Sequence, residues 1–228
     1  YQWQSSTDGI NFSNITGATV DSYTSGPLTM DTWFRLSVTS TLNGNSCTEV
    51  TNTVQITVIN FNAGSIASAQ TVCDGEVPAV FTSVDPSGDG VFTYQWQSSP
   101  DGTTWTPVAG ATSATYTPAA LTADTYFRRE VTSTLNTVQC IKYTGSVLVT
   151  VINFVRGSIS TDQTICENSM PVPITSVTPT GDGSFSYRWL SSPDGVTYTP
   201  ILGAINETFA PPALSADTWY KREVTSTL

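Results

Sequence analysis

The sequence predicts an all-β protein, in which small antiparallel β-sandwiches follow one another end to end. Three observations carry this prediction. The segment YQWQSSPDG at residues 94–102 recurs with few changes at residues 1 and 187, so the chain repeats with a period of 93 residues. Within the segment, aromatic and polar side chains alternate as they do in a half-buried strand. The Asp-Gly pair that closes it is a strong hairpin signal, and no stretch of the chain has helical periodicity.

The complete copy, residues 64–156, contains about seven short predicted strands, which is typical of an immunoglobulin-like sandwich of roughly 100 residues. The expected strands, in chain order, are residues 65–73, 80–84, 92–98, 104–108, 114–117, 125–133 and 145–152. Turn residues separate them, most densely in PSGDG at residues 86–90. The third strand is expected to be central, with Trp96 in the core.

The period predicts three units, residues 1–63, 64–156 and 157–228. The first is expected to lack its first two strands, and the third to lack its last strand. The segments between units contain no Gly/Ser-rich or Pro-rich spacer, so a semi-rigid rod is expected. We expect Phe61 and Phe154 to pack at the seams between neighbouring units.

The amino-acid composition argues against several classes of function. Charged residues make up 11% of the chain and the net charge is −10, a balance that repels nucleic acid and anionic membranes. No apolar run approaches 18 residues, so membrane insertion is not expected. The chain has no histidine, the commonest acid–base residue and transition-metal ligand. No catalytic motif is present, and we predict neither an enzyme nor catalytic residues.

The four cysteines follow the repeat, because Cys47 and Cys140 are 93 residues apart, as are Cys73 and Cys166. Pairing within a unit predicts a Cys73–Cys140 disulfide, with the partners of Cys47 and Cys166 outside the chain. The alternative is that disulfides link neighbouring units, through Cys47–Cys73 and Cys140–Cys166. Either pattern indicates an oxidising, extracytoplasmic location. No close cysteine pair suggests a metal site.

Two sets of side chains are candidates for ligand contact. Trp33, Tyr126 and Trp219 are equivalent residues on the outward face of the second long strand, and their rings are candidates for contact with a ligand or a neighbour. The turn carboxylates leave calcium binding open, although no Asp-x-Asp-x-Asp cluster supports it; they are Asp85, Asp89, Asp101 and Asp124. No other cofactor is expected.

The sequence resembles a known repeat in four features taken together. They are residues 94–102, the Gly-Ala-Thr at 110–112, the segment LTADTYFRR at 121–129 and the cysteine that follows. They are similar to the tandem immunoglobulin-like repeats of very large cell-surface adhesins in Bacteroidota-type bacteria. The resemblance covers the whole chain. It implies export by the type IX secretion system and a place at the cell surface, in proteins that serve gliding or attachment.

The resemblance implies a structural role, as stalk or filament repeats that project a binding region. The expected partners are then neighbouring repeats of the same chain, and identical chains in a lateral bundle. The alternative is that each repeat is itself a glycan-binding or protein-binding module.

Overall fold

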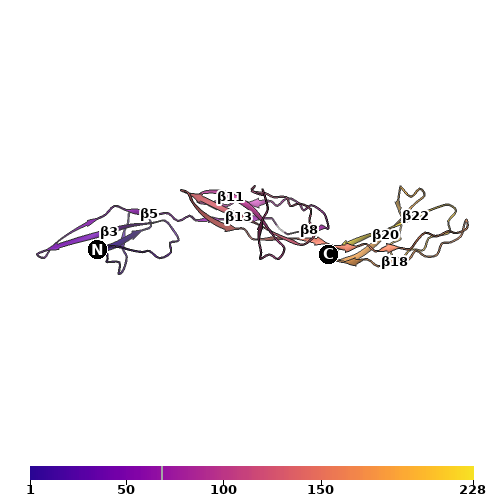
Figure 1. Ribbon diagram of the computed structural model, residues 1–228, viewed down its shortest axis with the longest axis horizontal. Helices are drawn as coiled ribbons and strands as arrows, with labels where there is room; N and C mark the ends of the chain where they lie inside the picture. The colour runs from indigo at the N-terminus through magenta and orange to yellow at the C-terminus, as the bar shows by residue number, and fades with distance from the viewer. Residues whose placement is uncertain (68) are drawn as a thin grey trace.

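The computed structural model describes residues 1–67 and 69–228. Its described residues form strands and turns without any helix, and therefore no helix that could cross a membrane. Three units follow one another in a row, with the two ends of the chain in different units (Figure 1). The predicted fold class, tandem antiparallel β-sandwiches of immunoglobulin-like type, is confirmed.

The strands have six residues or fewer, except for one in the first unit and two in each of the other units. The first unit contains β1 (Gln2–Ser6), β2 (Ser13–Asn14), β3 (Thr32–Leu42), β4 (Asn45–Val50) and β5 (Val54–Ile56). The middle unit contains β6 (Phe61–Asn62), β7 (Ser65–Ile66), β8 (Gln70–Cys73), β9 (Ser83–Val84), β10 (Ser87–Gly88), β11 (Val91–Ser99), β12 (Thr106–Pro107), β13 (Thr125–Leu135), β14 (Val138–Tyr143) and β15 (Val147–Ile152). The third contains β16 (Phe154–Val155), β17 (Ser158–Ile159), β18 (Ser176–Val177), β19 (Thr180–Gly181), β20 (Ser184–Ser192), β21 (Thr199–Pro200) and β22 (Trp219–Thr227).

The middle unit shows the complete arrangement. Its larger sheet has the order β12-β11-β13-β15-β8, and β14 also pairs with β13. All these pairs are antiparallel except β15 with β8. Small ladders, β6 with β10 and β7 with β9, and a bridge between Phe81 and Tyr116 form the opposite layer.

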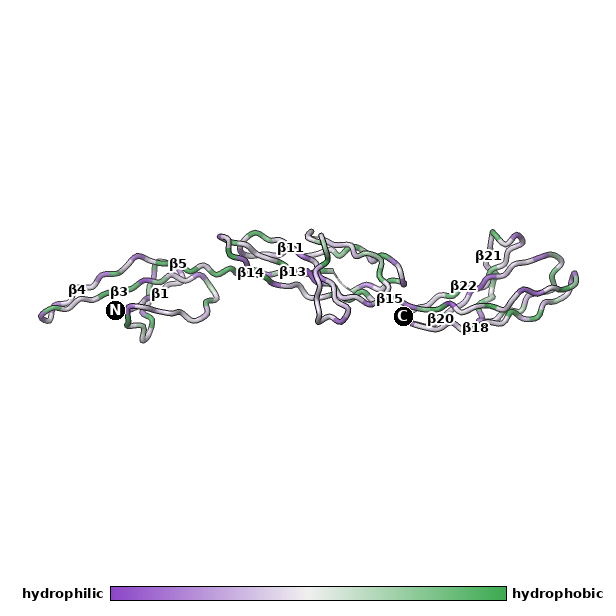
Figure 2. Tube along the Cα trace, viewed as in Figure 1, coloured by the Kyte–Doolittle hydropathy of each residue, from purple (hydrophilic) through white to green (hydrophobic). Residues whose placement is uncertain are grey.

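The core lies between these layers. Trp96 on β11 is fully buried, as predicted, and its ring stacks on that of Phe81 at 5.7 Å between centroids. Phe127 on β13 and Val149 on β15 complete this cluster. A second cluster, near the start of the unit, joins Phe61 to other buried apolar side chains. Figure 2 shows that hydrophobic and hydrophilic residues alternate at short intervals along the chain, as expected for strands with one buried face.

The units begin slightly earlier than residues 64 and 157. Phe61 pairs with Gly88 and contacts the ring of Phe92 in the middle unit. Phe154 pairs with Gly181 and contacts Phe185 in the third unit. The prediction that Phe61 and Phe154 pack at the seams is therefore wrong, since each ring contacts a phenylalanine of the unit that it opens, and Phe61 is buried there.

Candidate contact sites and joints between units

The joint between the first two units is held by two carboxylates. Asp31 of the first unit accepts a hydrogen bond from the Val58 amide at 2.9 Å. Asp89 of the middle unit accepts one from the Asn60 amide, also at 2.9 Å, and the Asp89 amide donates back to the Asn60 carbonyl. Ile59 alone separates these two anchored residues. A one-residue linker leaves little freedom for the units to swing apart.

The second joint repeats the same geometry. Asp124 accepts from the Val151 amide at 2.8 Å, and Asp182 accepts from the Asn153 amide at 2.9 Å. The intervening residue is again an isoleucine, Ile152. Two of the carboxylates that left calcium binding open, Asp89 and Asp124, thus serve the backbone of the joints.

A glycine makes the close approach at the joint feasible. Gly88 has a φ of +118°, a conformation that side-chain-bearing residues rarely adopt. A Cβ at this position would overlap the Asn60 carbonyl and lie 2.7 Å from the Phe61 Cα. Gly181 has the same φ within a degree and the same neighbours in the next unit. The Gly-Asp-Gly turn therefore holds the entering chain in place.

The three outward rings lie on the tight turns of their own units. Each ring lies against the glycine of its turn. A Cβ placed on Gly9 would be 3.2 Å from the Trp33 ring, and a Cβ placed on Gly102 would be 3.5 Å from the Tyr126 ring. Trp219 covers Gly195 in the same way. Trp33 and Tyr126 are partly buried, whereas Trp219 is 45% exposed. One face of each ring therefore packs on a turn, and the part left exposed is available for contact.

An aspartate organises each of these turns. Asp101 Oδ1 accepts from the amides of Thr103 and Thr104 and from the Ser99 hydroxyl. These donors, led by the Thr104 amide, hold the pKa of Asp101 well below its ordinary value. The equivalent turn lowers the pKa of Asp194 to about 2, chiefly through the Thr197 amide. The Asp-Gly motif is thus a structural turn in which protein donors hold the carboxylate of Asp101.

Beside the rings runs a row of cations stacked on aromatic side chains. The guanidinium of Arg128 lies 4.3 Å from the Trp105 centroid and 4.0 Å from that of Tyr143. Arg35 lies over Phe12 and Lys221 over Tyr198 in the other units. This face is polar and half exposed, as expected for the outer face of a strand.

Sequence reasoning missed a buried arginine. Arg129 is fully buried, and its guanidinium donates to the Ala114 carbonyl at 2.8 Å and to the Ser83 hydroxyl at 2.9 Å. It also donates to the Ala63 and Val84 carbonyls, and its Nε has no partner among the described residues. Burial lowers its pKa. The sequence could have indicated this burial. Side chains two residues apart on a strand face the same side, so residue 129 faces the core as Phe127 does.

The predicted Cys73–Cys140 disulfide is wrong for this fold. Both thiols are free, as are Cys47 and Cys166. Cys73 pairs with Ile152 at the exit of the middle unit, whereas Cys140 pairs with Ser133 near its entrance. The registers place them about 11 residues apart along the strands, roughly 35 Å. A disulfide needs Cα atoms within about 7 Å.

The alternative pairing fails for the same reason. Cys47 pairs with Ser40 on the hairpin of the first unit, at the end farther from the middle unit. Its proposed partner, Cys73, lies at the far end of the middle unit. Cys140 and Cys166 are likewise separated, because Cys166 occupies in the third unit the position that Cys73 has in the middle one.

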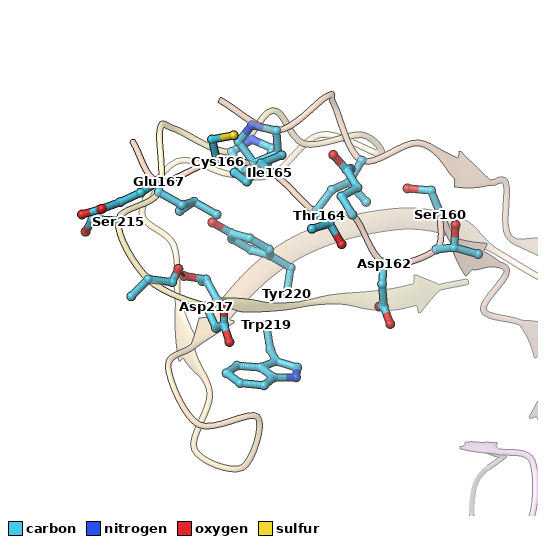
Figure 3. A pocket seen from close by; sticks show the side chains of 18 of the residues that line it. Ser160, Asp162, Thr164, Ile165, Cys166, Glu167, Ser215, Asp217, Trp219 and Tyr220 are labelled. Atoms are coloured by element: carbon cyan, nitrogen blue, oxygen red, sulfur yellow. Dashed lines mark hydrogen bonds between the residues drawn. The ribbon is translucent and has the colours of Figure 1, made fainter. Parts of the chain in front are cut away.

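A hollow in the third unit has a volume of about 600 Å³. It lies between residues 160–167 and the start of β22. In the middle unit, β15 lies between the equivalent strands, β8 and β13. Figure 3 shows Tyr220 pointing toward Ile165 and Cys166, while Trp219 lies on the other side of the strand. The hollow therefore lies at the place that the interior strand β15 occupies in the middle unit.

Metal-ligating side chains do not cluster in residues 1–67 and 69–228. These residues contain no group of three acidic, histidine or cysteine side chains that could hold a metal ion. The ion pair found in the described part of the chain, Arg188 with Glu223, is half exposed on the strand face.

Comparisons with known proteins place the chain by its repeat. No curated protein matches it. Among solved structures, it is similar to the crystal structure of the chicken CNTN1 FN1-FN3 domains, with 13% identity, a TM-score of 0.32, and coverage of 99% of this chain and 85% of that one. A family model described as a domain of unknown function, DUF8696, matches residues 1–60, 62–153 and 155–228, with breaks at the two joints. The chain therefore belongs to this family, as three consecutive copies of its domain.

Proposed function

We propose that the chain is a stalk or filament segment of a secreted bacterial surface adhesin, whose units act as rigid spacers that project a binding region. The single observation that supports this best is the joint. Both joints reduce the linker to one isoleucine, and both anchor it with one carboxylate from each side. A module that acted alone would gain nothing from a repeated, restrained connection to its neighbours.

The resemblance of the repeat to bacterial adhesin repeats supports the location outside the cell. It also supports the route, type IX secretion. An ordinary enzyme or receptor would concentrate unusual chemistry in one unit. Here the strongest polar features, the turn aspartates and the joint carboxylates, recur in successive units at the same positions.

Small-angle X-ray scattering in solution tests the spacer role. The intact chain should scatter as an extended particle whose cross-section is that of one unit. Asp31→Asn with Asp89→Asn should raise the scattering expected of flexible chains, because both anchors at the first joint weaken. Asp21→Asn with Glu49→Gln is the matched control, because it also removes two charges, both from exposed side chains of the first unit. A compact or already flexible intact chain would contradict the proposal.

The second candidate function is binding by each unit through the outward ring. It rests on Trp219, which keeps 45% of its surface exposed although one face covers Gly195. A glycan array and a surface-binding assay with the triple variant Trp33→Ala, Tyr126→Ala and Trp219→Ala test it. Binding by the natural chain that the triple variant loses would favour this function over the spacer role.

Lateral association of identical chains belongs to the first proposal. Threonine-rich strands and a low fraction of charged residues favour it, because few charged side chains lose water on contact, although the net charge of −10 on each chain opposes close approach. Sedimentation velocity across a hundredfold concentration range should show reversible growth in sedimentation coefficient. A strictly monomeric chain over that range would remove bundling from the proposal and leave the single rod.

A further inference from the structure

At each joint, the Cys73 position at the exit of one unit lies near the Cys140 position at the entrance of the next unit. We propose that, where complete copies of this unit follow one another, a disulfide crosses every joint, from the Cys73 position of one unit to the Cys140 position of the next. This pairing differs from both patterns expected from the sequence. It rests on the serial-rod function proposed above and gives that rod a covalent cross-link.

The first half of the evidence is the place of Cys73. In the parallel β8–β15 ladder, Cys73 is the register partner of Ile152, the isoleucine that links two units. Register partners on neighbouring strands project to the same face of a sheet. Val72 and Val151 point into the core, so Cys73 and Ile152 share the opposite, outward face. The Cys73 thiol is exposed there.

The second half is the place of Cys140, which the first joint shows. Ile59 is the equivalent of Ile152, and it packs against the Phe61–Val131 cluster of the following unit. Cys140 packs against the same cluster. Two residues on, Lys142 donates to the Phe61 carbonyl at 2.5 Å, which aligns β14 with the entering chain.

The hairpin tip that joins β13 to β14 extends this alignment toward the preceding unit. Thr57 and Ile59 line a small hollow together with the tip residues Leu135, Asn136 and Val138. The Cys140 position thus lies beside the linking isoleucine, on the side that faces back. The linking isoleucine is therefore the common neighbour of the two cysteine positions, one from each unit.

The present chain contains each half without its partner. The first unit has no residue at the Cys73 position, and the third has none at the Cys140 position, because those positions fall outside residues 1–228. This explains why all four thiols are free in a fold that places cysteines at regular sites.

Bond formation is an ordinary exchange. The thiolate of one cysteine attacks oxidised glutathione, and the second thiolate displaces glutathione from the mixed disulfide. The two thiols lose two protons and two electrons, and one oxidised glutathione becomes two reduced molecules. An oxidising compartment outside the cytoplasm supplies such a disulfide oxidant.

An extended chain tests the proposal. Residues 136–156 are appended after Leu228, which is the equivalent of Leu135, so that the third unit gains a hairpin, a last strand and a copy of Cys140. The protein is incubated with reduced and oxidised glutathione, and its disulfides are mapped by mass spectrometry. We expect one link, from Cys73 to the appended copy of Cys140, and free thiols at Cys47, Cys140 and Cys166.

Two variants and the unextended chain complete the test. In the extended chain, Cys73→Ser should abolish the link, whereas Cys166→Ser should leave it intact. The unextended chain should keep four free thiols. Links between Cys73 and Cys140 and between Cys166 and the appended cysteine, or no link in a chain whose circular dichroism shows folded strands, would overturn the proposal. Scattering of the reduced chain as a stiff rod in that case would show that the spacer function survives without the cross-link.

Discussion

The first and the middle units carry the same central pair of strands but differ in what covers it. In the first unit, β1 and β3 pair in the register of β11 and β13, with Gln2 opposite Ser37 as Gln95 is opposite Glu130. Yet Val38 is 36% exposed, whereas its equivalent, Val131, is fully buried. The covering segment in the middle unit is residues 61–90, whose equivalent for the first unit would precede residue 1 of the sequence.

The comparison shows that strand register and side-chain burial have different causes. Strand register comes from the paired strands themselves, whose alternating side chains fix which residues face the core. Burial comes from the opposite layer, which supplies Phe81 against Trp96 and the carbonyl groups around Arg129. At the equivalent of Arg129 the first unit has Leu36, which is only partly buried. We therefore expect equivalent substitutions to have unequal effects in the two units.

The largest contrast is expected at the central tryptophan. Trp96→Ala should destabilise the middle unit by about 3–5 kcal/mol, because it removes a fully buried ring from the core. Trp3→Ala, at the partly buried equivalent, should cost the first unit clearly less. Hydrogen-exchange mass spectrometry measures the loss of protection in each unit separately. Equal losses in the two units would show that the covering layer does not set the cost.

The next contrast concerns the two neighbouring arginines of β13. Arg129→Met should destabilise the middle unit by about 2–4 kcal/mol, because several buried acceptors lose their donor. Arg128→Met is the matched control on the outer face. It should cost less than about 1 kcal/mol, since its stacking on Trp105 is half exposed. Urea denaturation of the two variants compares them, and similar midpoints would refute the structural role of Arg129.

Gly88→Ala sharpens the comparison at the joint. The added Cβ would meet the Asn60 carbonyl and would strain a backbone with positive φ, so a cost of about 2–3 kcal/mol is expected. Protection should fall first in the amides of residues 60–62. Gly110→Ala is a fitting control, because its φ is also positive but its Cβ would meet nothing within 4 Å. Equal effects of the two substitutions would mean that backbone strain alone, and no contact at the joint, is responsible.

The smallest effect is a dependence of stability on pH that the units share. The turn donors lower the folded-state pKa of Asp8, Asp101 and Asp194 from an ordinary value of 3.8. Their contribution to stability is therefore complete above about pH 4 and is lost as the pH falls through the folded-state pKa values. Urea midpoints should fall between pH 5 and pH 2. In Asp101→Asn, the pH dependence of the middle unit should become shallower, and an unchanged slope would contradict this assignment.

Much of the fold could be predicted from the sequence, because a repeat and an alternating pattern report on local structure. The central position of Trp96 and the Asp-Gly turns followed from such patterns. The cysteine pairing did not, since equal spacing along a chain does not reveal which end of a sandwich each residue reaches. Only the parallel β8–β15 pair places Cys73 at the exit of its unit. The prediction that Phe61 packs between two units was wrong. Because the joint is only one residue long, Phe61 already lies within the middle unit, and its ring packs in that unit's core.

The rigidity of the joints can be measured directly by electron paramagnetic resonance. In a variant with its four cysteines replaced by serine, spin labels are placed in pairs at the equivalent exposed positions Ile10, Thr103 and Val196. The Ile10–Thr103 and Thr103–Val196 pairs each span one joint. The structure predicts two narrow distance distributions with nearly equal means, and broadening of the first alone by Asp31→Asn with Asp89→Asn. Broad distributions for both pairs in the otherwise unchanged chain would contradict the account of a clamped, one-residue joint.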